Sequence, residues 1–527
     1  MSEPMRQSVN SRLAGSCACC MLNRRRFLAG CAACVAGAGG VGLLSPRRAA
    51  AAEDATKPRV RLVYSYAPST GPIWPNIGYD FDRRKKELTA ALEAACPGIE
   101  FKPISVQNAD EAKKMLDEDK GIDGYLVYIL GLWTGAPRVI AASGRPTVCA
   151  DDLYGGSGEF LIANAAARRA KLNVAGVSSS RVEDVAAVAR CFEVLKKPGA
   201  TVDAFMAAAE AARRKGLKKP GDLKCAEDKA KITDPADCLK KLKASTMLVV
   251  GANNPTMAKG IQDVFGTKVI PIDFKELHGA YEQADQDEAA KWADRWMKRA
   301  EKVVEPGRDE IVRSGAMYLA ELALLKKYSA QAITINCLGG FYDNHIKAYP
   351  CLGFAQLNDD GLIGACEADQ LSTITMLAMN ALTGRPGYIS DPVIDTSKNQ
   401  IIYAHCVAST KVFGPDGKSN PYLIRSHSED RKGAVVQSLM PLGFMTTTVE
   451  FHPVKKAVIF HQGKAVANVD EDKACRSKLA VEVKGDMDKL LAEWDQWGWH
   501  RVTVYGDLKE PVNELAKALD LKVINEA

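Results

Sequence analysis

The stretch Cys366–His405 reads CEADQLSTITMLAMNALTGRPGYISDPVIDTSKNQIIYAH, and the fold prediction starts from it. The carboxylate Glu367 opens an apolar run with helical spacing, which ends in the turn Thr383–Gly387. Asp391 follows a short β-type segment, and His405 closes the next one. Loops at the ends of regular elements commonly carry functional side chains, so these three residues predict one site. Carboxylate oxygens with imidazole suit a hard or borderline divalent cation, and we expect manganese.

Strand-like and helical runs alternate on the N-terminal side of this stretch, in two units at residues 53–165 and 166–384. This alternation implies parallel sheets covered by helices on both faces. From residue 385 to 527 the pattern changes to short β-type runs separated by turn residues, and it ends in a strand, a helix and a strand. Such a pattern favours an antiparallel barrel or sandwich. The predicted fold class is α/β, with two parallel-sheet domains followed by a mostly antiparallel β C-terminal domain.

These motifs together resemble the L-fucose isomerase and L-arabinose isomerase superfamily. Glu367 and Asp369 form a Glu-x-Asp pair before an apolar helix that ends in Leu-Thr-Gly, as in that superfamily. Asp391 falls where the fucose type places its second metal carboxylate, and His500 falls where both types place a metal histidine. His405 resembles a further metal-site histidine of the arabinose type. The resemblance covers roughly the last 200 residues well and the earlier part by architecture only.

The resemblance implies two Rossmann-like domains and a β domain, with a metal in the cleft between them. Its ligands would be Glu367, Asp391 and His500, with His405 as a fourth ligand or close neighbour. Glu367 and Asp391 would also be catalytic, moving a proton between C1 and C2 of a small sugar in aldose–ketose isomerisation. Asp369 would not bind the metal itself but would orient a metal ligand through a hydrogen bond. Because family sites draw residues from neighbouring subunits, a homo-oligomer is expected.

Each of these residues also has an ordinary structural interpretation. Glu367 could complement a helix dipole, Asp391 before Pro392 could be a turn residue, and His405 and His500 could be core histidines. A non-catalytic periplasmic sugar-binding protein on the same fold is the main alternative function. An interaction or structural protein is the third possibility.

A polar run and one further histidine supply candidate sugar contacts. Arg425 and His427 lie in the run Arg425–Asp430, from which one loop could reach the cleft. His345 follows a predicted strand and could enter the same pocket. The alternative is that these side chains are simply solvated. The remaining histidines are predicted to be packing or surface residues: His278, His452 and His461.

The formal charge of +6 comes from the N-terminal segment alone. Residues 1–52 contain seven arginines and one acidic residue, which leaves 63 basic and 63 acidic residues in the remainder. A nucleic-acid surface would need basic residues clustered on the folded part. We therefore expect no nucleic-acid partner.

The same segment has the features of an export signal. Asn23–Leu28 resembles the twin-arginine motif, a weakly apolar Gly/Ala-rich run follows to Leu44, and small residues suited to cleavage occupy Ala49–Ala52. We expect residues 1–52 to direct export through the twin-arginine translocon to a periplasmic or extracellular location. A disordered terminus, a membrane anchor, or a lipoprotein signal at Cys31 are the alternatives.

The cysteines carry little further information. Five of the 15 lie in the N-terminal segment, and the other ten are scattered singly. Cys225 and Cys238 bracket a polar excursion, where a disulfide is plausible in an exported protein. Cys366 and Cys406 adjoin proposed site residues and are expected to be packing residues, because thiolate would favour a softer metal.

Overall fold

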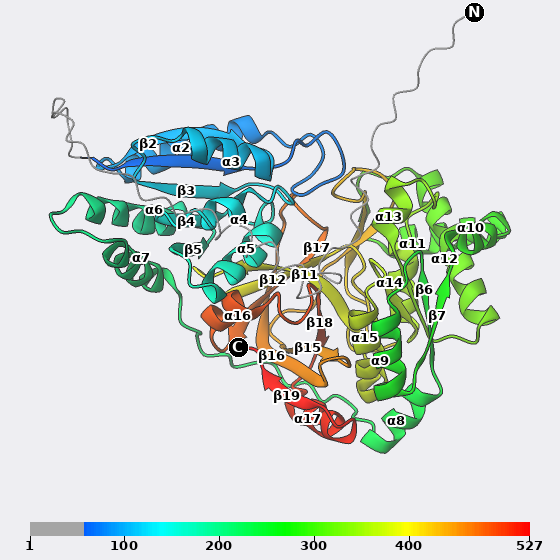
Figure 1. Cartoon of the computed structure of the whole chain (residues 1–527). Coiled ribbons are helices and arrows are strands. Elements are labelled where there is room, and N and C mark those ends of the chain that lie inside the picture. Colours follow the sequence, from blue (N-terminus) through cyan, green and yellow to red (C-terminus); the bar gives the residue numbers. More distant parts are fainter. Residues whose placement is uncertain (1–56) are drawn as a thin grey trace, which may run out of the picture.

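A computed structural model describes residues 57–527 and contains three domains (Figure 1). The predicted export signal at residues 1–52 lies outside the described residues. None of the helices between residues 57 and 527 is both long enough and apolar enough to cross a membrane.

The first domain is a five-stranded parallel sheet with the order β2-β1-β3-β4-β5. Helices cover both faces, and the core is built from the apolar strand residues. The strands are β1 (Arg59–Ser65), β2 (Glu100–Val106), β3 (Gly124–Ile129), β4 (Thr147–Asp151) and β5 (Val174–Ser178). The helices are α2 (Phe81–Ala95), α3 (Ala109–Glu118), α4 (Ala136–Ala141), α5 (Ser157–Arg169), α6 (Val182–Ala189), the 3-10 helix η2 (Arg190–Lys196) and α7 (Val202–Gly216).

The first domain extends beyond the boundary predicted at residue 165. That boundary falls inside α5, and β5 pairs with β4 in the first sheet rather than opening the second. Only the four residues 170–173 separate α5 from β5, and composition does not reveal which sheet the strand joins. In the structure β5 packs closely on α5, since a Cβ at Gly176 would lie 2.0 Å from the Asn164 side chain.

The second domain is a four-stranded parallel sheet with the order β10-β9-β6-β7. Its strands are β6 (Thr246–Val250), β7 (Lys268–Ile272), β9 (Ala332–Ile335) and β10 (Ile363–Ala365). Its helices are α8 (Pro235–Lys243), α9 (Pro255–Phe265), α10 (Phe274–Glu282), α11 (Gln286–Arg299), α12 (Arg308–Lys327), α13 (Cys337–Tyr342), α14 (Cys351–Asp359) and α15 (Gln370–Thr383). In such sheets ligand-facing residues follow the carboxyl ends of the strands, which is where Glu367 lies.

The third domain is a closed antiparallel barrel that lies between the other two in Figure 1. Its strands follow the order β15-β18-β11-β12-β17-β16, and pairing of β15 with β16 closes the ring. The barrel strands are β11 (Tyr388–Asp395), β12 (Gln400–His405), β15 (Met445–His452), β16 (Ala457–Asn468), β17 (Ser477–Lys484) and β18 (Arg501–Tyr505). This architecture confirms the predicted fold class and selects the barrel over the sandwich.

The remaining elements extend the barrel and join it to the second domain. β19 (Lys522–Asn525) adds in parallel to β16, and β13 (Tyr422–Arg425) pairs with both β14 (Val435–Ser438) and β8 (Lys302–Val303). Two helices, α16 (Met487–Glu493) and α17 (Lys509–Ala518), pack outside the barrel.

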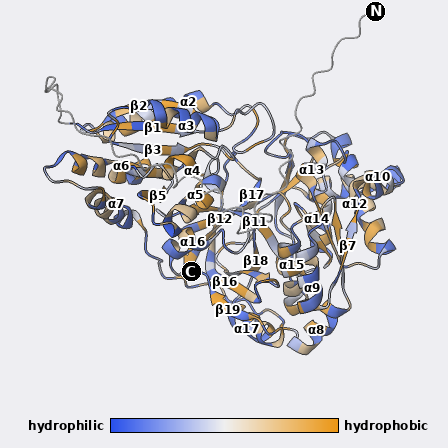
Figure 2. Ribbon diagram, in the orientation of Figure 1, coloured by the Kyte–Doolittle hydropathy of each residue, from blue (hydrophilic) through white to orange (hydrophobic). Residues whose placement is uncertain are grey.

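Helix α15 supports the turn that carries Glu367. It is buried almost all round, because it packs between the second sheet and barrel strands β15 and β18. Most other helices show both blue and orange ribbon in Figure 2, as expected of helices with one face in solvent. Each fully buried Leu, Ile or Met side chain on α15 contributes roughly 1.5–3 kcal/mol. The turn before α15 therefore rests on a rigid element.

Candidate metal centre

Four potential ligand side chains converge where the second domain meets the barrel. One donor atom from each of Glu367, Asp391, His405 and His500 lies within 4.8 Å of the others. Asp391, His405 and His500 are 6, 2 and 3% exposed, and Glu367 is partly buried. All four were candidates from the sequence, and the structure brings them together.

The register of the barrel strands brings three of them side by side. In β11, Ser390 pairs with Arg501, so the next residue, Asp391, stands opposite His500 at the start of β18. On the other edge of β11, Asp391 pairs with Ala404, the neighbour of His405. Asp391 therefore lies between the two strands that carry the histidines.

Glu367 reaches the same point from the second domain through a turn with unusual backbone angles. Glu367 and Ala368 have φ values of +62° and +50°, a left-handed conformation that costs free energy for residues other than glycine. The Ala368 N–H donates to the carbonyl of Ile335 at 2.9 Å, and the Asp369 side chain caps α15. Strain held in place by its surroundings is common at functional sites.

The spacing of the donor atoms suits a shared cation. His500 Nε2 lies 3.3 Å from Asp391 Oδ1 and 3.6 Å from Glu367 Oε2, and His405 Nε2 lies 3.6 Å from Glu367 Oε1. Both Nε2 atoms are buried, and neither has a hydrogen-bond partner among residues 57–527. Donors that each lie about 2.1 Å from one cation are roughly 3 Å apart. The residues present therefore fit a divalent metal ion.

Neighbouring side chains orient the cluster. His500 Nδ1 lies 2.9 Å from Asp369 Oδ2, so a proton on Nδ1 leaves the Nε2 lone pair facing Glu367 and Asp391. Trp499 Nε1 donates to Asp391 Oδ1 at 2.6 Å. Asp369 thus stands behind His500, as a supporting carboxylate would.

The two histidines differ in the side of the ring that carries the proton. The backbone N–H of Cys406 donates to His405 Nδ1 at 3.0 Å, so the neutral His405 ring holds its proton on Nε2. In this arrangement His500 offers a lone pair and His405 offers an N–H. The role of His405 as a fourth ligand or close neighbour stays a prediction.

Charge in the cluster is balanced between the carboxylates and the imidazoles. Burial disfavours the ionised form of Asp391, but His500 and His405 outweigh it and hold its pKa below the usual value. Burial also disfavours protonated His500, yet Glu367, Asp369 and Asp391 raise its pKa well above the ordinary value. The negative field that favours a proton on His500 is the field that would favour a cation at this position.

Two of the residues predicted to contact sugar, His427 and Arg425, have protein side chains as partners. His427 is buried, with Nδ1 3.2 Å from Asp430 Oδ1. The Arg425 guanidinium forms a bidentate pair with Glu305 and also donates to Gln437. A sugar contact by either residue stays a prediction.

His345, the third residue predicted to contact sugar, is exposed. Its ring stacks on Phe274 with 5.0 Å between centroids. Phe274 is the first residue of α10, and a role of His345 in sugar binding stays a prediction.

Sequence reasoning missed Glu429. Its carboxylate accepts a hydrogen bond from the Tyr342 hydroxyl at 2.7 Å. Burial raises its pKa against the opposing effect of His427, and the negative charges of Glu367 and Asp391 raise it further. The only sequence signal was its position in the polar run Arg425–Asp430.

Loops of the first domain reach the same region. The Ile77 N–H donates to the Glu429 carbonyl at 2.8 Å, and the Ala474 N–H donates to the Pro75 carbonyl at 2.9 Å. These hydrogen bonds join the first domain to the loops at Glu429 and Ala474, and the predicted cleft between the domains stays a prediction.

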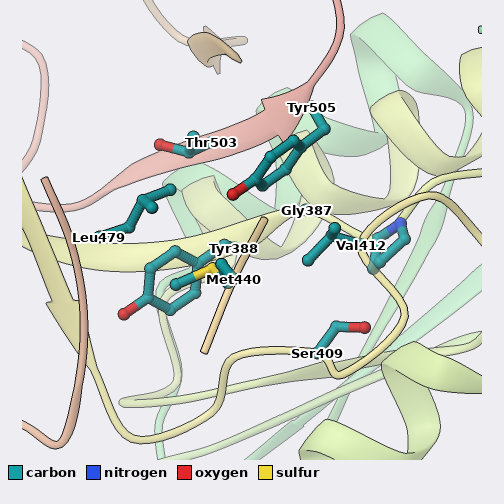
Figure 3. A pocket seen from close by; sticks show the side chains of 9 residues that line it. Gly387, Tyr388, Ser409, Val412, Met440, Leu479, Thr503 and Tyr505 are labelled. Carbon is teal, nitrogen blue, oxygen red and sulfur yellow. The ribbon is translucent and has the colours of Figure 1, made fainter. Parts of the chain in front are cut away.

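Two other features lie apart from this centre. The small cavity in Figure 3 is lined by nine residues from barrel strands and from loops beside them, including Tyr388, Met440 and Tyr505, and by none of the four donors. Cys225 and Cys238 are free thiols rather than a disulfide, since they contact the carbonyls of Leu223 and Thr233. The excursion between them is tied to the barrel instead, through Ala226 N–H and the Gly443 carbonyl.

Comparison with known proteins gives one group of relatives. A sulfoquinovose isomerase from Clostridium sp. (strain MSTE9) is 26% identical over 278 residues, which cover 49% of this chain and 58% of that protein. Sulfoquinovose isomerases from Alkalicoccus urumqiensis and Priestia aryabhattai are 21% and 25% identical, covering 55% and 54% of this chain and 66% and 65% of theirs. The matches thus span about three fifths of the length of these relatives.

The other comparisons are weaker. No family model matches the chain. The crystal structure of the Francisella novicida lysine decarboxylase LdcF aligns with a TM-score of 0.18 and 13% identity, over 42% of this chain and 37% of that one, which is too low to compare folds. The sequence relatives support a relationship between this chain and sugar isomerases over about half of its length.

Proposed function

We propose that this protein is a metal-dependent sugar isomerase that interconverts an aldose and a ketose. The observation that carries the proposal is the buried convergence of two carboxylates with two imidazoles whose Nε2 atoms have no partner. A binding protein that recognises only sugar hydroxyls does not need this donor set. The names of the sequence relatives support the same reaction type.

Glu367, Asp391 and His500 would hold the cation. We expect manganese, because carboxylates with imidazole suit a borderline divalent ion. When bound, such an ion acts as a Lewis acid on the sugar carbonyl and the adjacent hydroxyl. His405 becomes a fourth ligand only if its proton leaves Nε2; otherwise its N–H is available to a sugar oxygen.

The carboxylates would also move the proton. Isomerisation through an ene-diol needs one group that accepts a proton from carbon and one that returns it. Glu367 is the more accessible of the pair, and Asp391 is held in place by Trp499. Asp369 keeps the His500 ring oriented, which fixes the lone pair of Nε2.

Export through the twin-arginine pathway and assembly into a homo-oligomer are parts of the same proposal. The motif at Asn23–Leu28 supports export, and a route that carries folded proteins suits a metalloenzyme. N-terminal sequencing of the native protein should show that residues 1–52 are absent, whereas a mature chain beginning at Met1 would contradict export.

The deciding experiment combines metal analysis with a sugar panel. Purified protein is loaded with Mn²⁺, assayed for bound metal, and incubated with aldoses and ketoses that include sulfoquinovose, L-fucose and L-arabinose. We expect stoichiometric metal and an isomerised product in the wild type, and loss of both in Asp391→Ala with the fold retained.

A matched control lies on the same strand. Asp395→Asn alters a carboxylate that accepts hydrogen bonds from Ser397 and Ser180 and does not belong to the cluster, so metal should stay bound. Full metal occupancy in Asp391→Ala would overturn the metal assignment. Tight sugar binding without product or solvent exchange in metal-loaded wild type would favour the non-catalytic binding protein.

A further inference from the structure

A pair of thiols lies beside the turn that carries Glu367. Cys337 Sγ and Cys366 Sγ are 3.0 Å apart, and the two residues are 2 and 4% exposed. Two sulfurs in a disulfide are about 2.05 Å apart. A shift of roughly 1 Å would therefore join them.

The two cysteines come from neighbouring strand ends. Cys337 and Cys366 follow the carboxyl ends of β9 and β10, which are parallel neighbours with Thr334 paired to Ala365. Continued by one residue, this register places Cys366 opposite Ile335, and Cys337 begins α13 two residues later. The Sγ separation of 3.0 Å shows that the two side chains already turn toward each other across this offset.

We propose that Cys337 and Cys366 form a disulfide on oxidation, and that this bond holds the turn at Glu367. Two S–H bonds break and one S–S bond forms, with two protons and two electrons passing to the oxidant. A protein disulfide of an oxidising compartment would accept them and become a dithiol. The small azo compound diamide accepts the same two protons and electrons and becomes a hydrazine.

The bond would act on a segment that is already strained. Cys366 directly precedes Glu367 and Ala368, the two residues with positive φ, and the Ala368 N–H already ties the turn to Ile335 at the end of β9. The disulfide would add a covalent tie between the same two strand ends. It would limit the conformations open to Glu367 before any ligand binds, and preorganisation of this kind favours binding.

The experiment treats the native full-length protein with diamide and compares it with protein kept reduced. Mass spectrometry after digestion should find peptides joined through Cys337 and Cys366. Hydrogen exchange should be slower at residues 366–369 in the oxidised form. Mn²⁺ alone should bind the oxidised form roughly threefold to tenfold more tightly.

Three variants sharpen the test. Cys337→Ser and Cys366→Ser should each abolish the linked peptides and the slower exchange. Cys149→Ser removes a buried thiol in the first sheet and should leave both effects intact. The wild-type peptide analysis stands on its own if a variant fails to fold.

Several results would overturn the inference. One is that the thiols of Cys337 and Cys366 remain free after treatment; another is a link between Cys406 and Cys475, the neighbouring thiol pair, in their place. A linked protein whose exchange at residues 366–369 is unchanged would also overturn it. Only the manganese measurement rests on the proposed function, so absent Mn²⁺ binding in both forms would count against the metal site and not against the disulfide.

Discussion

Two buried histidine–carboxylate clusters in this protein differ in whether their polar atoms are satisfied. The closed cluster consists of His461, Glu526, Arg501 and Tyr403. His461 contacts Glu526 at 3.0 Å through Nδ1 and the Tyr403 hydroxyl at 2.6 Å through Nε2, and Arg501 pairs with Glu526. The open cluster consists of Glu367, Asp391, His405 and His500, and in the part of the chain that the structure describes neither Nε2 atom has a hydrogen-bond partner.

The contrast is sharp because the two clusters meet along the chain. His500 belongs to the open cluster and Arg501 to the closed one, on opposite sides of the chain at the start of β18. Buried polar groups in proteins are usually hydrogen-bonded. In the closed cluster the side chains hydrogen-bond to one another, so the fold alone explains them. In the open cluster the buried Nε2 atoms of two histidines are left for a ligand to bind.

The largest expected effect comes from breaking the open cluster chemically. Glu367→Gln keeps the shape and an oxygen but cannot accept a proton, so turnover of the sugar identified in the panel should fall roughly 10²–10⁴-fold. Sugar binding should change much less. The exposed Glu510→Gln on α17 is the matched control and should be neutral. Unchanged turnover in Glu367→Gln would remove this residue from the mechanism.

The next effect comes from breaking the closed cluster. Burial opposes ionisation of Glu526, but Arg501 and His461 outweigh it and hold its pKa at about 2. Glu526→Ala leaves a buried cation unpaired and should lower the free energy of unfolding by roughly 3–5 kcal/mol, measured by denaturant titration. Asp391→Ala in the open cluster should cost far less stability. Similar losses of unfolding free energy in Glu526→Ala and Asp391→Ala would contradict the distinction between the closed and the open cluster.

A smaller effect should follow from weakening the contact that orients His500 in the open cluster. Asp369→Asn weakens the contact with His500 Nδ1, and loss of such a supporting contact typically reduces metal affinity about 10–100-fold. Mn²⁺ titration measures the change, with Asp395→Asn as control. An affinity equal to that of the wild type would show that His500 needs no partner to stay oriented.

The smallest effect tests whether an unsatisfied carboxylate alone implies a ligand. Glu321 on α12 is fully buried with neither oxygen hydrogen-bonded, and burial raises its pKa well above the ordinary value. Its stabilising contribution is present below the unfolded pKa of about 4.3 and is lost as pH rises through the folded pKa. Glu321→Gln should therefore lose less stability than the wild type between about pH 5 and pH 9, by about 1 kcal/mol or more.

Thermal unfolding at several pH values measures this difference. Metal content should be the same in Glu321→Gln as in the wild type, because among residues 57–527 Glu321 belongs to no group of three or more converging donors. An equal pH dependence in both proteins would show that Glu321 is not held in its neutral form.

The sequence predicted a β-rich third domain from the short β-type runs and turn residues after residue 385, which need no tertiary information. The four open-cluster residues were predicted from the resemblance of their motifs to the L-fucose isomerase and L-arabinose isomerase superfamily. His405 ends β12 as expected, but Asp391 lies within β11 rather than after a strand. The partner of β5, the closure between β15 and β16, and the free state of Cys225 and Cys238 were not predictable in this way. Each depends on contacts between segments far apart in the chain.

The sequence by itself determined which residue types stand in or beside which elements, because periodicity and turn chemistry act over a few residues. Only the tertiary structure decided which of these residues meet. The register of Ser390 with Arg501 places Asp391 against His500, more than a hundred residues away. The tertiary structure also decided which buried histidines form hydrogen bonds through both ring nitrogens. An Nε2 atom is left without a partner only by the positions of all the donors and acceptors around it.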